Sequence, residues 1–210
     1  MMKKFFSLVI CFFVFLIVPV VSFSASPGPY VSAQVGMGFL MDSDISDPSG
    51  TGTLEFDPGF ATGIAGGYNF GMFRVEGEIG YQINDIDRIS ACSGGSCGSA
   101  SASGDVTALS FLANAYFDFV NKTPFTPYIT AGIGVARLDI DDFAVLGYRI
   151  GDSDDTVFAY QVGAGVAYAI NKNFSIDLKY RFFGTSDPDF DGVDAEFNSH
   201  NIYLGLRYNF

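Results

Sequence analysis

The sequence is poor in several residue types. It has no tryptophan, one histidine and three cysteines in 210 residues, and its 11 lysines and arginines are outnumbered by 23 aspartates and glutamates. So acidic a chain is not expected to bind nucleic acid, because phosphates attract lysine and arginine. Beyond residue 25 it also lacks an apolar run of the ~20 residues that a membrane helix needs, although 49% of its residues are hydrophobic.

The one long apolar run lies at the N-terminus. Lys3 and Lys4 precede a nearly unbroken apolar stretch from Phe5 to Val21, and Ser22, Ser24 and Ala25 supply small residues directly after it. A basic start, an apolar run and a small-residue cleavage site are the parts of a secretory signal peptide. We therefore expect residues 1–25 to be cleaved, with an uncleaved anchor helix as the alternative, and residues 26–210 to form one domain.

Two cysteines remain in the exported part, Cys92 and Cys97, within the segment CSGGSC. An even pair in an exported chain favours a disulfide, here at the tip of a glycine- and serine-rich loop. A metal site is the alternative. It would have to recruit His200, the only histidine, which is distant in sequence.

Apolar residues recur at every second position through most of the exported chain. Residues 73–83 are an example, with Phe73, Val75, Ile79 and Tyr81 alternating with Arg74, Glu76, Glu78 and other polar or small residues. Such alternation predicts β-strands. An even number of strands of about ten residues predicts an all-β fold, an eight-stranded antiparallel up-and-down transmembrane β-barrel. The predicted strands are residues 31–39, 60–69, 73–84, 109–119, 128–135, 158–170, 174–182 and 201–210.

The connections between these segments alternate in length. Short ones lie at 71–72, 120–126 and 171–173, whereas long ones lie at 42–58, 85–105, 139–155 and 184–199. Outer-membrane barrels have short periplasmic turns and longer extracellular loops. The alternation therefore predicts that the four long loops face the exterior and that both chain ends face the periplasm.

Charged residues within the strands share the face opposite the apolar one. A soluble lipocalin-like barrel would keep its apolar face inside and its charged face outside. Facing lipid, an arginine or lysine would cost about 2–4 kcal/mol at the midplane, so we expect the charges to pair inside the barrel. Because eight strands leave just enough room for side chains, a plugged barrel is expected, with a narrow polar conduit as the alternative. The predicted charge cluster is Arg74, Glu76, Glu78, Asp118, Asp177, Lys179, Arg181 and Arg207.

Four segments carry a resemblance to a known family: YITAGIG (128–134), YQVGAGVAY (160–168), DLKYRFF (177–183) and NIYLGLRYNF (201–210). They resemble the OmpA-type, opacity-protein-like small outer-membrane barrels, also termed porin family proteins. The resemblance implies contact with outer-membrane lipid and lipopolysaccharide. It also implies that the barrel-assembly machinery recognises the terminal apolar comb, which consists of Ile202, Leu204, Leu206, Tyr208 and Phe210.

The fourth long loop contains a partial calcium motif. Asp187, Asp189 and Asp191 alternate as in the opening of a calcium loop, and Asp194 or Glu196 would complete a weak site. The motif fails at its last position, where Asn198 replaces the usual glutamate. A solvated acidic loop without bound metal is therefore the alternative.

Catalysis has little support in the sequence. Ser199 and His200 are the only adjacent serine and histidine, and neighbours in a strand point to opposite faces. We expect no enzyme activity and no cofactor. The expected function is a structural and surface-interaction role, adhesin- or antigen-like, with acidic loops contacting a host or neighbouring cell surface. The alternative is a small channel for ions or small polar solutes.

Overall fold

The computed structural model describes residues 27–41, 43–47, 50–93, 96–145, 148–186, 189–190, 193–194 and 197–210. Side chains are described for 27–41, 56–86, 104–139, 154–186 and 197–210. All regular elements in these parts are β-strands. In the same residues, no helix has the length and apolar character to cross a membrane.

The strands follow one another along the chain with short connections. Their bounds are β1 (Gly28–Leu40), β2 (Ser43–Asp47), β3 (Gly50–Phe56), β4 (Gly59–Asn69), β5 (Phe73–Ser93), β6 (Ser96–Asp118), β7 (Phe125–Val145), β8 (Tyr148–Ala169), β9 (Phe174–Thr185), β10 (Asp189–Phe190), β11 (Val193–Asp194) and β12 (Asn198–Asn209).

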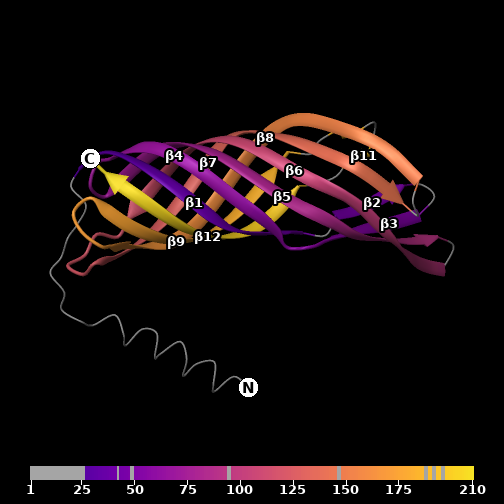
Figure 1. Cartoon of the computed structure of the whole chain (residues 1–210), viewed down its shortest axis with the longest axis horizontal. Coiled ribbons are helices and arrows are strands. Elements are labelled where there is room, and N and C mark those ends of the chain that lie inside the picture. Colours follow the sequence, from indigo (N-terminus) through magenta and orange to yellow (C-terminus); the bar gives the residue numbers. More distant parts are fainter. Residues whose placement is uncertain are drawn as a thin grey trace, which may run out of the picture.

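Eight of these strands close into a barrel, which confirms the predicted fold (Figure 1). The order around the barrel is β5-β4-β1-β12-β9-β8-β7-β6, and β5 pairs with β6 to complete the circle. Every pairing between these neighbours is antiparallel. Pairing of β1 with β12 brings together opposite ends of the chain, Tyr30 opposite Asn209.

Two of the connections predicted as loops are mostly strand. Residues 85–105, here called the β5–β6 arm, pair up to Ser93 opposite Ser96, and residues 139–155, the β7–β8 arm, pair up to Val145 opposite Tyr148. Part of a third connection forms the β2–β3 hairpin, which pairs with β5. In Figure 1 these hairpins project beyond the barrel at the end opposite the C-terminus. Antiparallel pairing satisfies the backbone polar groups along the paired edges of these segments.

The side chains of the barrel fall on two distinct faces. Outward residues are apolar and exposed, as at Val35, Ile64 and Leu204. Inward residues on the half nearer the short turns are mainly polar or charged. On the half nearer the arms, the interior holds an apolar cluster that the sequence analysis did not predict. This arm-side cluster consists of Ile86, Val106, Ala108, Leu112, Ala136, Leu138, Val157, Ala159, Phe183 and Phe197.

Candidate functional site

An arginine and an aspartate form the ion pair nearest the short turns. Arg74 on β5 donates from Nε and Nη2 to the two carboxylate oxygens of Asp118 on β6, at 2.7 and 2.9 Å. The Arg74 guanidinium carbon also lies 4.2 Å from the ring centroid of Tyr116 and 5.0 Å from that of Tyr128. Bidentate pairing and stacking on aromatic faces both suit a planar guanidinium, so Arg74 is fixed in place.

A second group of charges lies farther from the turns. Arg181 donates from Nη1 to Oε1 of Glu78 at 2.8 Å, and Lys179 donates from Nζ to Oε2 of Glu78 at 3.5 Å. All three side chains are buried. Arg181 also donates from Nη2 to the hydroxyl of Tyr203. The alternation of β9 places Lys179 and Arg181 on the same inward face, so one carboxylate lies between two cations.

Uncharged side chains hold Glu76, whereas the sequence predicted that the charges inside the barrel pair with one another. Its carboxylate accepts hydrogen bonds from the hydroxyls of Tyr30 and Tyr116, at 2.8 and 2.6 Å, and from Nδ2 of Asn114 at 3.3 Å. Uncharged donors therefore satisfy this buried carboxylate. Tyr30 lies on the inward face of β1, which alternation indicates, but its contact with Glu76 depends on the register of the strands.

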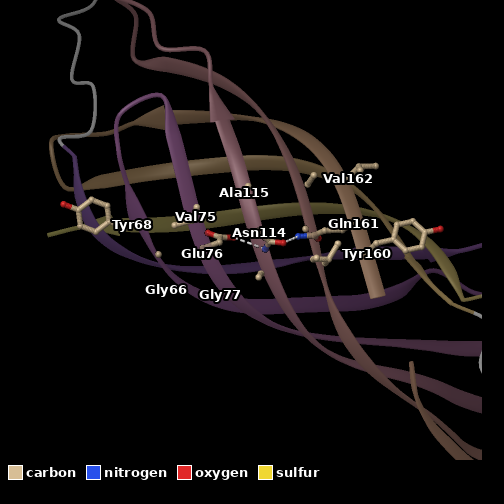
Figure 2. A pocket seen from close by; sticks show the side chains of 15 residues that line it. Gly66, Tyr68, Val75, Glu76, Gly77, Asn114, Ala115, Tyr160, Gln161 and Val162 are labelled. Atoms are coloured by element: carbon tan, nitrogen blue, oxygen red, sulfur yellow. Dashed lines mark hydrogen bonds between the residues drawn. The ribbon is translucent and has the colours of Figure 1, made fainter. Parts of the chain in front are cut away.

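Asn114 and Gln161 join these groups into one network. Asn114 donates to Glu76 and to Oε2 of Glu78, Gln161 donates from Nε2 to Oδ1 of Asn114, and Arg181 donates to Oε1 of Gln161. Figure 2 shows Asn114 between Glu76 and Gln161. A Cβ built on Gly132 would collide with Oδ1 of Asn114. Glycine at this position therefore makes room for the central amide of the network.

The remaining pair borders a small cavity. Nη2 of Arg207 forms an ion pair with Oδ1 of Asp177 at 3.4 Å, while its Nε and Nη1 have no hydrogen-bond partner among the described residues. The cavity measures ≈ 30 Å³ and is lined by Arg207, Lys179, Glu76 and other members of the network. A polar cavity of this size holds one or two water molecules. The structure thus brings all eight predicted lumen charges inside the barrel.

The outer wall carries a much larger groove. It measures ≈ 810 Å³ and crosses β4 to β8 (Figure 2). Its lining includes the small residues Gly66, Gly77, Ala113, Ala115 and Ala131, and a Cβ added at Gly66 or Gly77 would meet open space. The hollow arises because these small side chains lie on the otherwise bulky outer face. Figure 2 labels Tyr68 and Tyr160 at either side of the labelled group.

The other predicted sites are described only in part. Cys92 and Cys97 are Cα partners across the β5–β6 arm, but their side chains lie outside the described set, so the disulfide stays a prediction. The calcium residues Asp187, Asp191 and Glu196 also lie outside the described residues. Of that motif, only the pairing of Asp189 with Asp194 is described, and the calcium site likewise stays a prediction.

Ser199 and His200 point to opposite faces of β12. The Ser199 hydroxyl lies inside the barrel and donates to Oε1 of Gln82 at 3.3 Å. His200 instead places its Nδ1 atom 2.7 Å from the Tyr180 hydroxyl, and its ring stacks on Tyr180 on the outer face. The two side chains therefore cannot act as a catalytic pair. The terminal comb also faces outward, and Phe210 is 67% exposed.

Comparison with known proteins gives consistent matches. A family model described as outer membrane protein beta-barrel domain matches residues 9–210. Outer membrane protein PagN of Salmonella typhimurium is 30% identical over 117 residues, 48% of this chain and 48% of PagN. A putative adhesin of Rickettsia conorii is 25% identical over 120 residues, 49% of this chain and 48% of its own. The matched region thus spans about half the length of these curated relatives.

Among solved structures, the crystal structure of Neisserial surface protein A is similar over most of its length. It superposes with a TM-score of 0.59 at 25% sequence identity, covering 87% of this chain and 97% of that protein.

Proposed function

This chain belongs to the outer membrane protein β-barrel domain family, and we propose that it serves as a non-enzymatic surface-interaction protein of the cell outer membrane. The proposal rests on a difference between the interior of the barrel and the strands that extend beyond it. The interior of the barrel is filled, whereas two pairs of strands continue far beyond it. In an outer-membrane barrel the short turns face the periplasm and the longer connections face the exterior, so the arms are the part available to other surfaces.

The filled interior argues against the channel alternative. A solute would have to pass the charged network, whose cavity is only ≈ 30 Å³, and then the arm-side cluster, which includes Leu138 and Phe183. Opening the first layer would separate buried ion pairs, and a buried charge left without its partner costs several kcal/mol. Opening the second would require close-packed apolar side chains to move apart.

The arms are long in comparison with the membrane. A transmembrane β-strand needs about 9–11 residues, whereas β5, β6, β7 and β8 have 21, 23, 21 and 22 residues. About half of each strand is therefore in excess of the span. The β7–β8 arm carries Asp141, Asp142 and Asp152, and Arg137 at its base pairs with Asp139 and Asp154, each at 3.2 Å. An acidic arm favours a basic partner surface.

The names of the similar proteins agree with this role, since one is a surface protein and another a putative adhesin. The proposed partners are a host or neighbouring cell surface at the arms and lipopolysaccharide around the outward-facing apolar residues. The barrel-assembly machinery is a further proposed partner, at the terminal comb from Ile202 to Phe210.

A charge-neutral arm tests the proposal. Bacteria displaying the protein with Asp141→Asn, Asp142→Asn and Asp152→Asn should adhere several-fold less to cultured host cells, at equal surface levels. The control carries Ser99→Asn, Ser101→Asn and Ser103→Asn on the β5–β6 arm and should adhere as the parent does. Unchanged adhesion of the aspartate variant would contradict the proposal. Stable unitary openings of the parent protein in planar bilayers would favour the channel instead.

A further inference from the structure

The periplasmic rim carries a pocket that neither the lumen nor the arms involve. It measures ≈ 360 Å³ and is lined by Asn171, Lys172, Asn173, Phe174 and Tyr208. These residues belong to the short turn between β8 and β9 and to the end of β12, where Phe174 pairs with Tyr208. The pocket therefore lies where the outward-facing wall of the barrel meets the periplasm.

Hydrogen bonds hold the turn that forms this pocket. The Asn171 side-chain oxygen accepts the backbone N–H groups of Asn173 and Phe174, at 2.8 and 2.9 Å. Asn173 is tied to β12 in turn, because it donates from Nδ2 to the Asn209 carbonyl and its own carbonyl accepts the Asn209 N–H, at 2.8 and 2.7 Å. The turn is thus preorganised, which lowers the entropic cost of binding a ligand.

The two sides of the pocket differ in chemistry. One side is aromatic, with the rings of Phe174 and Tyr208 5.0 Å apart. The other side is polar, and Lys172 is exposed there with no ion-pair partner among the described residues. None of the lining residues is acidic. The pocket therefore suits an amphiphile that has an anionic head and an apolar body.

We propose that this pocket binds the headgroup of an anionic phospholipid in the periplasm-facing leaflet. The headgroup phosphate lies against the Lys172 ammonium, and the Asn171 amide group is a second donor beside it. The acyl chains follow the Phe174 ring into the apolar band of the barrel. Basic residues beside a membrane attract anionic lipids, and aromatic rings at the interface stabilise the position of the barrel in it.

Lys122 provides a matched control within the same protein. It lies on another of the short turns, between β6 and β7, and is also exposed. There the Asn121 amide donates to the carbonyls of Phe119 and Phe125, and its oxygen accepts from Thr123. The Asn121 side chain is therefore engaged within its own turn. Lys122 lines none of the described pockets.

The test is native mass spectrometry of the protein from nanodiscs that contain phosphatidylcholine and phosphatidylglycerol. The parent protein should retain phosphatidylglycerol in preference to phosphatidylcholine. Removing the charge with Lys172→Met should lower that retention about fivefold, the factor expected when one lysine contact with an anionic headgroup is lost, whereas Lys122→Met, at a residue that lines none of the described pockets, should leave it unchanged. Heat-dependent gel mobility checks that both variants are folded barrels.

Two results would overturn the assignment. Equal retention by the parent and Lys172→Met would remove the site, and an equal loss in both lysine variants would show diffuse attraction. Inorganic phosphate separates a lipid site from a site for the free anion. If phosphate alone shifts the Lys172 NMR signal in phosphatidylcholine nanodiscs as strongly as phosphatidylglycerol does, the ligand is the free anion and the lipid assignment is wrong.

Discussion

Arg181 and Glu78 face each other across the lumen from β9 and β5, joined by a 2.8 Å hydrogen bond between buried charged groups. The two strands are not neighbours in the barrel, since β5 pairs with β4 and β6 while β9 pairs with β8 and β12. This contact therefore braces opposite parts of the wall, which backbone pairing alone does not connect.

Removing one partner of this pair should leave the other as a buried charge without a counter-charge. We expect Glu78→Gln and Arg181→Met each to lower the free energy of unfolding by about 3–5 kcal/mol, measured by urea unfolding in detergent micelles. The double variant should lose less than the two single losses together. Lys179→Met, with its longer 3.5 Å contact to Glu78, should couple to Glu78→Gln more weakly. Strictly additive losses would show that Glu78 and Arg181 do not act together.

A methyl group at Gly132 should disturb the lumen network, because the new Cβ collides with Oδ1 of Asn114. Overpacking of this kind costs about 1–3 kcal/mol, and we expect Gly132→Ala to lower the urea midpoint accordingly. Gly77→Ala is the matched control, since its Cβ points into open space on the outer wall. Because replacing glycine by alanine lowers the entropy of the unfolded chain and by itself stabilises, an equal loss in both variants would show that the effect does not depend on Asn114.

Deletion of Phe210 should reduce assembly into the outer membrane. Its ring packs 5.0 Å from that of Tyr208, and its N–H donates to the Pro29 carbonyl at the junction of β12 and β1. Quantitative blotting of membrane fractions should show depletion of the truncated protein and its degradation in the periplasm. Phe210→Tyr, which retains an aromatic ring, should assemble normally. Parental levels of the truncated protein would rule out a requirement for this residue.

The fourth connection should bind calcium weakly if its aspartates act as ligands. Calorimetric titration should give a dissociation constant of about 10⁻⁴–10⁻³ M, the range of extracellular calcium modules. Asp189→Asn combined with Asp191→Asn should abolish the heat signal. Superimposable isotherms for the parent and the variant would leave only diffuse acidic charge in this segment.

Alternation along the strands was sufficient to predict the barrel and the inward direction of its charges. It failed in the arms because segments such as SCGSASASGD (96–105) are small or polar on both faces. Such segments show no alternation of apolar and polar residues, even though they are extended. Part of the arm-side cluster was missed for the same reason. Ile86 and Phe197 belong to segments predicted as loops, where no face could be assigned. The tyrosine partners of Glu76 depend on pairing register, which a single sequence does not specify.

The pairing of β1 with β12 has a kinetic consequence. Each of the other seven barrel pairings joins strands that lie close together along the chain, so each pairing has a small entropic cost of loop closure. The β1–β12 pairing, with Tyr30 opposite Asn209, joins strands that are separated by almost all of the barrel sequence, so it is expected to form last. Contacts between distant residues slow folding. Until this last seam forms, both edge strands expose unpaired backbone, and that is the interval in which the protein is most prone to aggregation.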